Sequence, residues 1–346
     1  MAPIEDGFDG DNFSNNLFTD LAPLLTLFGE QVTKQFVSLS LSWVDNVLLA
    51  AGPLGITTVV VSAIRVGGSP LLKSLVGRAR EERAVIEQEL LSSTSDEVCE
   101  LWNGNSIVRT KGRPANSMTT LIITDKGRIL SLEGAVGAGV YCNHGIDVKS
   151  GLKFQYPPPN LTLNLRSPAK QSAEIFIFSL LGIFLQAAGL AVSGLAHYQW
   201  GWAQSKSQDQ SYAYPLYIAG TLLLFLGVMG CGRIVESATS ESHLYFTEAH
   251  SGRVAVVRLQ DACIVGDQLF PSVAIFNPFE ISEVCVSVLD MTPSRYFPLV
   301  ATILTMTGFV IQFIGLRNLH WSASIMQLGI TLTMTVIRAY VRRGLS

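Results

Sequence analysis

The longest uncharged stretch of the chain runs from Ile175 to Leu195 and reads IFIFSLLGIFLQAAGLAVSGL. Lys170 and Glu174 precede it, His197 follows it, and its only strongly polar side chain is Gln186. At ~1.5 Å per residue, a helix of this length matches the ~30 Å hydrocarbon core of a bilayer. A helix of a soluble protein is rarely apolar on every face over such a length, so the pattern predicts a membrane span.

Four further uncharged stretches repeat this pattern: Val47 to Ile64, Pro215 to Gly232, Phe297 to Leu316 and Trp321 to Ile337. The first is short and is interrupted by glycine and proline at Gly52, Pro53 and Gly55, so we expect it to be kinked. The last two are separated only by the sequence RNLH, which indicates a tight helical hairpin. The hydrophobic pattern therefore predicts five spans, at 47–64, 175–195, 215–232, 297–316 and 321–337.

The composition agrees with a multi-pass membrane protein whose direct partner is the lipid bilayer. Charged residues make up 15% of the chain, against ~25% in soluble domains, and hydrophobic residues make up 48%. The net charge of -3 gives no support for nucleic-acid binding. The five cysteines form no C-x-x-C pair, so they indicate neither a disulfide framework nor a zinc knuckle.

Basic residues flank the predicted spans on one side of the membrane, which the positive-inside rule assigns to the cytosol. They are Arg65, Lys73, Arg78, Arg80, Arg83, Arg166, Lys170, Arg233, Arg295, Arg338, Arg342 and Arg343. Five spans then place an acidic segment (1–46) and a loop (196–214) outside, and two loops (65–174 and 233–296) and a basic tail (338–346) in the cytosol. Asn12 heads an outside Asn-Phe-Ser sequon, so it is the glycosylation candidate, whereas the Asn160 sequon would be cytosolic and unmodified.

The acidic N-terminal segment carries no basic, apolar leader, so we expect no cleavable signal peptide. Within it, apolar residues from Leu17 to Phe36 recur at helical spacing. This predicts an amphipathic helix that packs on the spans, because helices that bind membrane surfaces are usually basic.

The two cytosolic loops are too long to be simple connections. The first opens with Ser69-Pro70, a helix start, and its apolar spacing continues to Leu90. Thr94 to Glu97 resembles a capping box before a short helix, EVCELW. Strand-like segments follow at 106–109, 119–132 with a turn at 125–127, 243–247, 253–259, 272–276 and 284–289.

Neither loop has enough strands to fold alone, so we expect both to build one domain. Alternation along the strands suggests that Leu121 and Ile123 face Val257 and Leu259 in its core. The predicted fold class is a multi-pass α-helical membrane protein with a small β-rich cytosolic domain.

No residue set nominates a catalytic, cofactor or metal site. Gly134, Gly137 and Gly139 do not have the spacing of a phosphate-binding loop and are better read as a flexible loop between strands. Cys142 and His144 could ligate a metal only with two further ligands from elsewhere. His243, His250 and Cys263 lack the spacing of any zinc motif, so we expect no metal and no cofactor.

The span interiors hold no Asp, Glu, Lys, Arg or His and only three amides, at Gln186, Gln312 and Gln327. Transporters and channels usually carry ionisable groups there. Small residues four apart, at Gly189 and Ser193 and at Gly227 and Cys231, permit close helix packing.

The segments LAPLLTLFGEQVTKQF, WVDNVLLAAGPLGITTVVVSAIRVGG and STSDEVCELWNG resemble the N-terminal membrane module of a group of filamentous-fungal proteins, some of which continue into ankyrin repeats. The resemblance covers about the first 150 residues. It implies a membrane-anchored platform and brings no catalytic residues. No T-P-L-H-x-A repeat follows Leu195 in this chain.

We therefore expect a membrane-anchored interaction or scaffold protein with protein partners on its cytosolic face. Two alternatives stay open: a transporter or channel subunit, and a membrane-bound enzyme or accessory factor of a lipophilic pathway.

Overall fold

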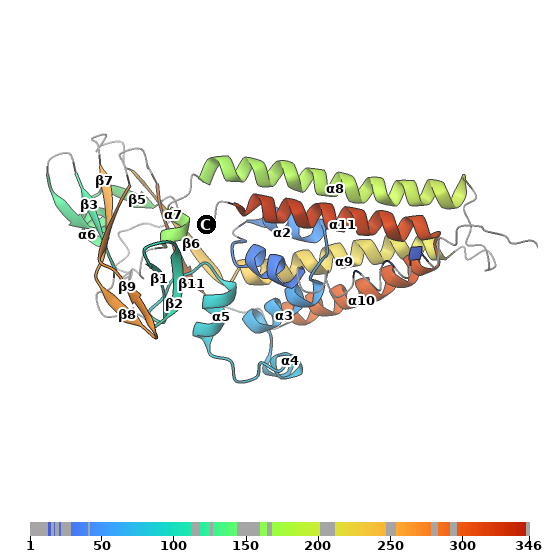
Figure 1. Cartoon of the computed structure of the whole chain (residues 1–346), viewed down its shortest axis with the longest axis horizontal. Helices are drawn as coiled ribbons and strands as arrows, with labels where there is room; N and C mark the ends of the chain where they lie inside the picture. Colours follow the sequence, from blue (N-terminus) through green and yellow to red (C-terminus); the bar gives the residue numbers. More distant parts are fainter. Residues whose placement is uncertain are drawn as a thin grey trace, which may run out of the picture. The chain divides into compact units, whose positions relative to one another are not determined.

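The computed structural model describes residues 13–14, 17, 21, 29–40, 42–112, 118–124, 127–143, 160–164, 168–200, 212–246, 254–277, 283–290 and 296–343. The chain divides into two compact units, each made from separate stretches of sequence (Figure 1). Met1–Ala79, Ala169–Glu236 and Pro293–Gly344 form a helical unit. Arg80–Pro168 and Ser237–Thr292 form the bulk of a β-rich unit.

Four helices of the helical unit are long and apolar enough to cross a membrane. They are α8 (Pro168–Tyr198), α9 (Ala213–Glu236), α10 (Phe297–Arg317) and α11 (Trp321–Val341). Each covers one of the last four predicted spans, and only Asn318 to His320 separates α10 from α11. Within the described part of the chain, the structure is consistent with a membrane protein and confirms these four apolar helices.

The first predicted span is not one helix. α2 (Trp43–Ala51) and α3 (Ile56–Gly67) occupy this stretch, and both are too short to cross a bilayer as single helices. Pro53 lacks a backbone N–H, and Gly55 has a φ of 74°, a left-handed conformation that glycine tolerates best. The glycine and proline residues predicted a kink, whereas the structure has a complete break.

Glycines bring α9 and α10 into backbone contact. A Cβ atom added at Gly227 would lie 2.5 Å from the Thr305 backbone nitrogen, and one added at Gly315 would lie 2.5 Å from that of Tyr217. Gly220 and Gly308 alternate with them along the same interface. Small residues permit such close packing inside membranes, as the spacing of Gly227 and Cys231 predicts.

The described residues of the β-rich unit form four small sheets. A two-stranded sheet pairs β1 (Val98–Trp102) with β2 (Ile107–Lys111), and another pairs β8 (Cys263–Val265) with β9 (Gln268–Phe270). The four-stranded sheet has the order β10 (Val273–Asn277), β7 (Ala255–Gln260), β3 (Met118–Ile123) and β4 (Ile129–Ser131). The three-stranded sheet has the order β11 (Glu283–Leu289), β6 (Thr239–Phe246) and β5 (Tyr141–Asn143).

Strands from the two predicted loops pair directly, which confirms that both loops build one domain. β3 and β7 are antiparallel neighbours, with Leu121 opposite Val257 and Ile122 opposite Val256. The predicted core face is wrong, however, because Ile122 and Val256 are buried while Leu121 and Val257 are only partly covered.

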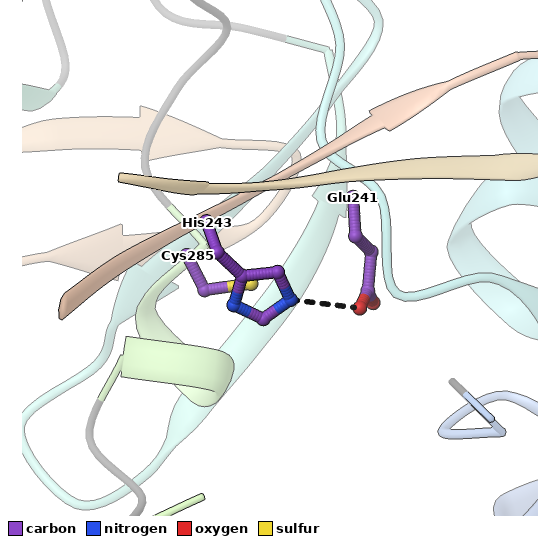
Figure 2. Close-up of side chains that lie close together, drawn as sticks. All are labelled: Glu241, His243 and Cys285. Carbon is purple, nitrogen blue, oxygen red and sulfur yellow. Dashed lines mark ion pairs between the residues drawn. The ribbon is translucent and has the colours of Figure 1, made fainter. Parts of the chain in front are cut away.

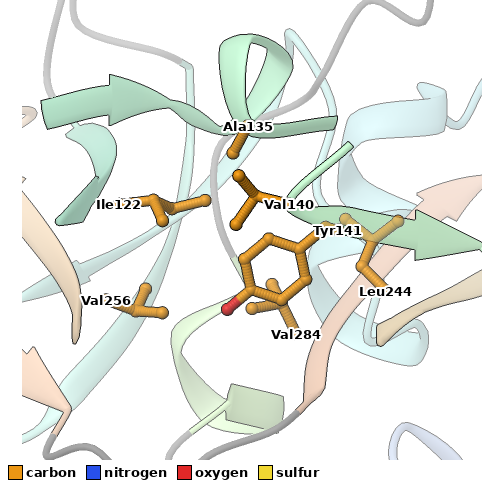
Figure 3. Packing of buried hydrophobic residues seen from close by; sticks show 7 residues of the cluster. All are labelled: Ile122, Ala135, Val140, Tyr141, Leu244, Val256 and Val284. Atoms are coloured by element: carbon orange, nitrogen blue, oxygen red, sulfur yellow. The ribbon is translucent and has the colours of Figure 1, made fainter. Parts of the chain in front are cut away.

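The buried face contributes to a core cluster in which Ile122 and Val256 lie near Tyr141 and Val284 (Figure 3). Ala135 and Val140 close the cluster. They belong to the glycine-rich segment, which forms helix α6 (Leu132–Gly137) and the turn after it instead of the predicted loop. Ser131 caps this helix, because its Oγ accepts a hydrogen bond from the backbone N–H of Gly134 at 3.1 Å.

Two other helix predictions need correction. The helix expected from Ser69 to Leu90 is split into α4 (Pro70–Leu75) and α5 (Arg83–Leu90), and Gly77 between them has a φ of 72°. The segment EVCELW is not helical, because its residues from Val98 to Trp102 form β1 and pair in full register with β2. Here strand pairing overrides the local capping pattern.

Candidate functional site

The broken helix of the helical unit ends against a buried arginine. Arg338 is 1% exposed, and its Nη2 donates a hydrogen bond at 2.7 Å to the carbonyl of Gly52, just after the end of α2. Its Nε and Nη1 atoms have no hydrogen-bond partner among the described residues. The sequence places Arg338 at a span edge, and only the structure shows that its side chain points into the bundle.

A buried ion pair holds the start of α2. Arg342 donates to the Asp45 carboxylate at 2.9 Å and to the Leu39 carbonyl at 2.8 Å. Asp45 also accepts hydrogen bonds from the backbone and side chain of Ser42, the N-cap of α2. The residue that caps the C-terminus of α11 therefore fixes the start of α2 through a charged and hydrogen-bonded contact.

The three glutamines predicted inside the spans connect neighbouring helices. Gln186 donates to the carbonyl of Ala51 at 2.7 Å, Gln327 accepts from the Tyr217 hydroxyl at 2.8 Å, and Gln312 donates to Thr221 at 3.1 Å. Such bonds stabilise helix association where no water competes for the polar groups. They account for these amides without requiring a conducting path.

Both ends of the α2–α3 pair lie at the same end of the bundle. Asn46 of α2 hydrogen-bonds Glu236, the last residue of α9. Gly67, the last residue of α3, lies against Ile234 of α9 and Pro298 of α10. Between them, Ala51 reaches Gln186, about 16 Å along α8 from Ile175 at ~1.5 Å per residue.

In the β-rich unit, the side-chain amides of Asn160 and Asn164 form hydrogen bonds with the backbone of β11 along its edge. Asn160 precedes α7 (Leu161–Asn164), and Asn164 is the last residue of this helix. Asn164 accepts from the Cys285 N–H at 2.9 Å and donates to the Cys285 carbonyl at 2.8 Å. Asn160 makes the same pair of bonds with Ser287, at 2.8 and 3.3 Å. The edge is therefore covered and held in one position.

Three metal-ligating side chains gather on the face of β6 and β11 that points away from the core. His243 and Cys285 are directly opposite each other, and Glu241 precedes His243 by two residues. Their ligand atoms all lie within 4.8 Å of one another. Figure 2 shows the three side chains close together. His243 Nε2 lies 3.8 Å from a Glu241 oxygen.

A second polar cluster surrounds Glu87 in α5. The hydroxyls of Ser93 and Ser95 donate to its carboxylate at 2.9 and 2.7 Å. Arg109 lies beside it, pairs with Glu100 at 2.8 Å and donates to the Ser93 carbonyl. Burial raises the pKa of Glu87, although both serine hydrogen bonds and the charge of Arg109 lower it.

Arg258 is buried on the core face of β7, which also carries the buried Val256 and Gln260. Burial lowers its pKa to about 10, and burial raises the pKa of the nearby Tyr141 to about 12. Nε and Nη1 of Arg258 have no hydrogen-bond partner in the described part of the unit.

The structure describes only some of the candidate residues identified from the sequence. Asn12, His144 and His250 and the side chain of Cys142 lie outside the described residues, so glycosylation of Asn12 stays a prediction. Asn160 is 0% exposed, and its amide is occupied by strand bonds, so the folded chain cannot be modified there.

The sequence offers His243 as a candidate ligand, but no motif spacing links it to Glu241 or Cys285. Glu241 lies two residues from His243, which is a signal that alternation along a strand could have provided. Cys285 is 42 residues further on, and only the strand register brings it opposite His243.

No protein-family model, curated protein or solved structure matches this chain.

Proposed function

We propose that the protein is a membrane-anchored interaction protein, in which a multi-pass helical unit holds a β-rich unit for binding other proteins. The observation that carries this proposal is the pairing of β3 with β7. The two strands are separated in sequence by α8 and α9. The β-rich unit therefore forms only when the segment before α8 and the segment after α9 come together. This pairing supports a single folded platform for binding and argues against two mobile loops.

The hairpin of β8 and β9 provides the surface that fits a protein partner. Ile264 and Leu269 are directly opposite each other and are 70% and 71% exposed. Burying this exposed pair against a partner protein would stabilise the complex by about 1.5–3 kcal/mol for each fully buried side chain.

Cross-linking mass spectrometry of the full chain in its own membranes tests this role. The double variant Ile264→Lys/Leu269→Lys should lose cross-links from the hairpin to other proteins. Ile129→Lys is the matched control, because Ile129 is 63% exposed on β4 of the same unit. The interaction role is refuted if the double variant retains the wild-type cross-links.

The break between α2 and α3 favours a second candidate, a transporter or channel subunit. Broken helices and inward-facing ionisable residues are typical of transport proteins. Arg338 combines both features, since it hydrogen-bonds the Gly52 carbonyl after α2 and has two side-chain nitrogens without a partner among the described residues. Anion flux into liposomes containing the purified protein, lost in Arg338→Gln, would establish this function in place of the first.

The same geometry suggests a revised topology, with four spans and a re-entrant hairpin made by α2 and α3. The contacts of Asn46 and Gly67 at one end of the bundle support a hairpin that enters and leaves on one face. The basic residues near that end, among them Arg233 and Arg342, make it the cytosolic face under the positive-inside rule.

Cysteine labelling distinguishes the two topologies. In a cysteine-free background, Ser38→Cys and Ser69→Cys should react with an impermeant maleimide from the same side of the membrane. Labelling from opposite sides would show that residues 47–64 cross the membrane, as the five-span topology predicts. With the hairpin, glycosylation of Asn12 requires the chain to cross the membrane between Asn12 and Ser38.

A further inference from the structure

We propose that Glu241, His243 and Cys285 bind a zinc-class divalent ion on the outer face of the β6–β11 pair. Carboxylate, imidazole and thiolate are the three side-chain types that bind zinc in proteins. Three protein ligands leave one coordination position open for water or another donor.

The backbone places these ligands before any ion arrives. Because side chains alternate along a strand, Glu241 and His243 share one face while Leu244 of β6 points into the core. The antiparallel register sets Cys285 directly opposite His243 on that same face. Tyr245 stacks on the imidazole, with ring centroids 6.3 Å apart and planes 21° apart, which helps to fix its orientation.

The distances suit a small ion after slight side-chain movement. Ligand bonds of ~2.0–2.3 Å in a tetrahedral site place the ligand atoms about 3.3–3.7 Å apart. His243 Nε2 and the nearest Glu241 oxygen are 3.8 Å apart, and all three ligand atoms lie within 4.8 Å. A rotation of the glutamate or thiol side chain closes this difference.

The Glu241 carboxylate provides an independent indication of a ligand. Its Oε2 atom lies 3.8 Å from His243 Nε2, and its other oxygen, Oε1, is buried and has no hydrogen-bond partner among the described residues. A buried carboxylate oxygen without a partner is costly, and a bound cation removes that cost. A polar face that served only for contact with solvent would not bury this oxygen.

Asn164 adds rigidity behind the thiol. Its side-chain amide bonds both the N–H and the carbonyl of Cys285, so the backbone that carries the ligand is held at a sheet edge. Asn164 is thus a positioning residue for the proposed site.

The ligand chemistry also predicts selectivity. Thiolate and imidazole favour zinc and its softer relatives, whereas calcium and magnesium prefer sites made only of oxygen atoms. Binding should weaken as pH falls, because protons compete for the thiolate and the imidazole.

The test uses the full-length protein, purified in detergent with a non-thiol reductant and stripped of metal by a chelator. Zn²⁺ should bind at one equivalent per chain, and Co²⁺ should give a sulfur-to-cobalt charge-transfer band. Cys285→Ser and Glu241→Gln should each weaken Zn²⁺ binding at least tenfold, and Cys285→Ser should abolish the cobalt band. Calcium and magnesium should not compete.

Cys263→Ser is the matched control, because Cys263 lies on β8 of the same unit and outside the cluster. It should keep both the stoichiometry and the cobalt band. Glu241→Gln preserves side-chain size, and its circular dichroism should match the wild type, so loss of binding in this variant cannot be attributed to misfolding. The proposal is overturned if the wild type binds no Zn²⁺, or if Cys285→Ser binds it as tightly as Cys263→Ser. Neither result depends on the protein-binding hairpin of β8 and β9.

Discussion

Replacing Gly227 by alanine tests whether close packing of α9 on α10 holds the helical unit together. The added Cβ would lie 2.5 Å from the Thr305 backbone nitrogen and 2.7 Å from the Thr305 Cα. Ordinary contacts of this kind are ~3.5 Å, so the two helices must separate by about 1 Å. Because backbone atoms cannot rotate away as a side chain can, we expect a cost of about 1–3 kcal/mol.

Gly329 supplies the matched control. It lies inside α11, and a Cβ added there would meet no heavy atom within 4 Å. Both replacements remove the same backbone freedom from the unfolded chain, a gain of about 0.4–1 kcal/mol where the native conformation accepts alanine. The difference in stability between Gly227→Ala and Gly329→Ala therefore isolates the steric cost at the α9–α10 contact.

The assay is unfolding of the purified full-length protein by increasing SDS in mixed micelles, followed by circular dichroism. Gly329→Ala should unfold at or above the wild-type midpoint, and Gly227→Ala below it. If Gly227→Ala is as stable as Gly329→Ala, the close contact at Thr305 does not stabilise the bundle and the reasoning fails.

Three further changes test other parts of the structure. Arg342→Gln leaves Asp45 buried without its charged partner and should cost about 3–5 kcal/mol, and Asp45→Asn in the same chain should restore part of that loss in a double-mutant cycle by SDS unfolding. Burial holds the pKa of Glu87 above its ordinary 4.5, so the folded state retains the proton longer than the unfolded chain. Wild-type stability should then fall as pH rises from that value through the folded pKa, and the decline should be smaller in Glu87→Gln, with thermal unfolding across this pH range as the measurement. Val256→Asp places a charge in the core and should speed proteolysis of both segments of the β-rich unit, whereas Val257→Asp should do so less; equal rates would contradict the observed face assignment.

The sequence by itself determined the elements whose signal is local and long. Four helices appear where uncharged stretches of suitable length occur, because a long apolar stretch has few stable alternatives to a helix inside a membrane. The alternating segments near 119–132 and 253–259 became strands, and their small number per loop was enough to predict a shared domain.

Where a local sequence pattern is compatible with more than one structure, only the tertiary structure decided which one forms. The segment EVCELW satisfies a local helix rule, yet pairing with β2 makes it a strand, since hydrogen bonds across a sheet outweigh a single cap. Alternation correctly separated the two faces of β3 and β7, but it could not tell which face α6 and β5 would cover. The break at Gly52 to Gly55 likewise left open where α2 and α3 lie, and only the contacts of Asn46 and Gly67 place both ends of this pair at one end of the bundle.

For the candidate metal site, sequence spacing likewise identifies two of the ligands but not the third, Cys285. The sequence offers Glu241 and His243 two residues apart, a spacing that strand alternation turns into one face. Cys285 joins them only through the register of β11 on β6, which depends on long-range packing and on the asparagines that hold the edge of β11. Sequence spacing carries local chemistry, whereas a site assembled from distant strands exists only once the sheet has formed.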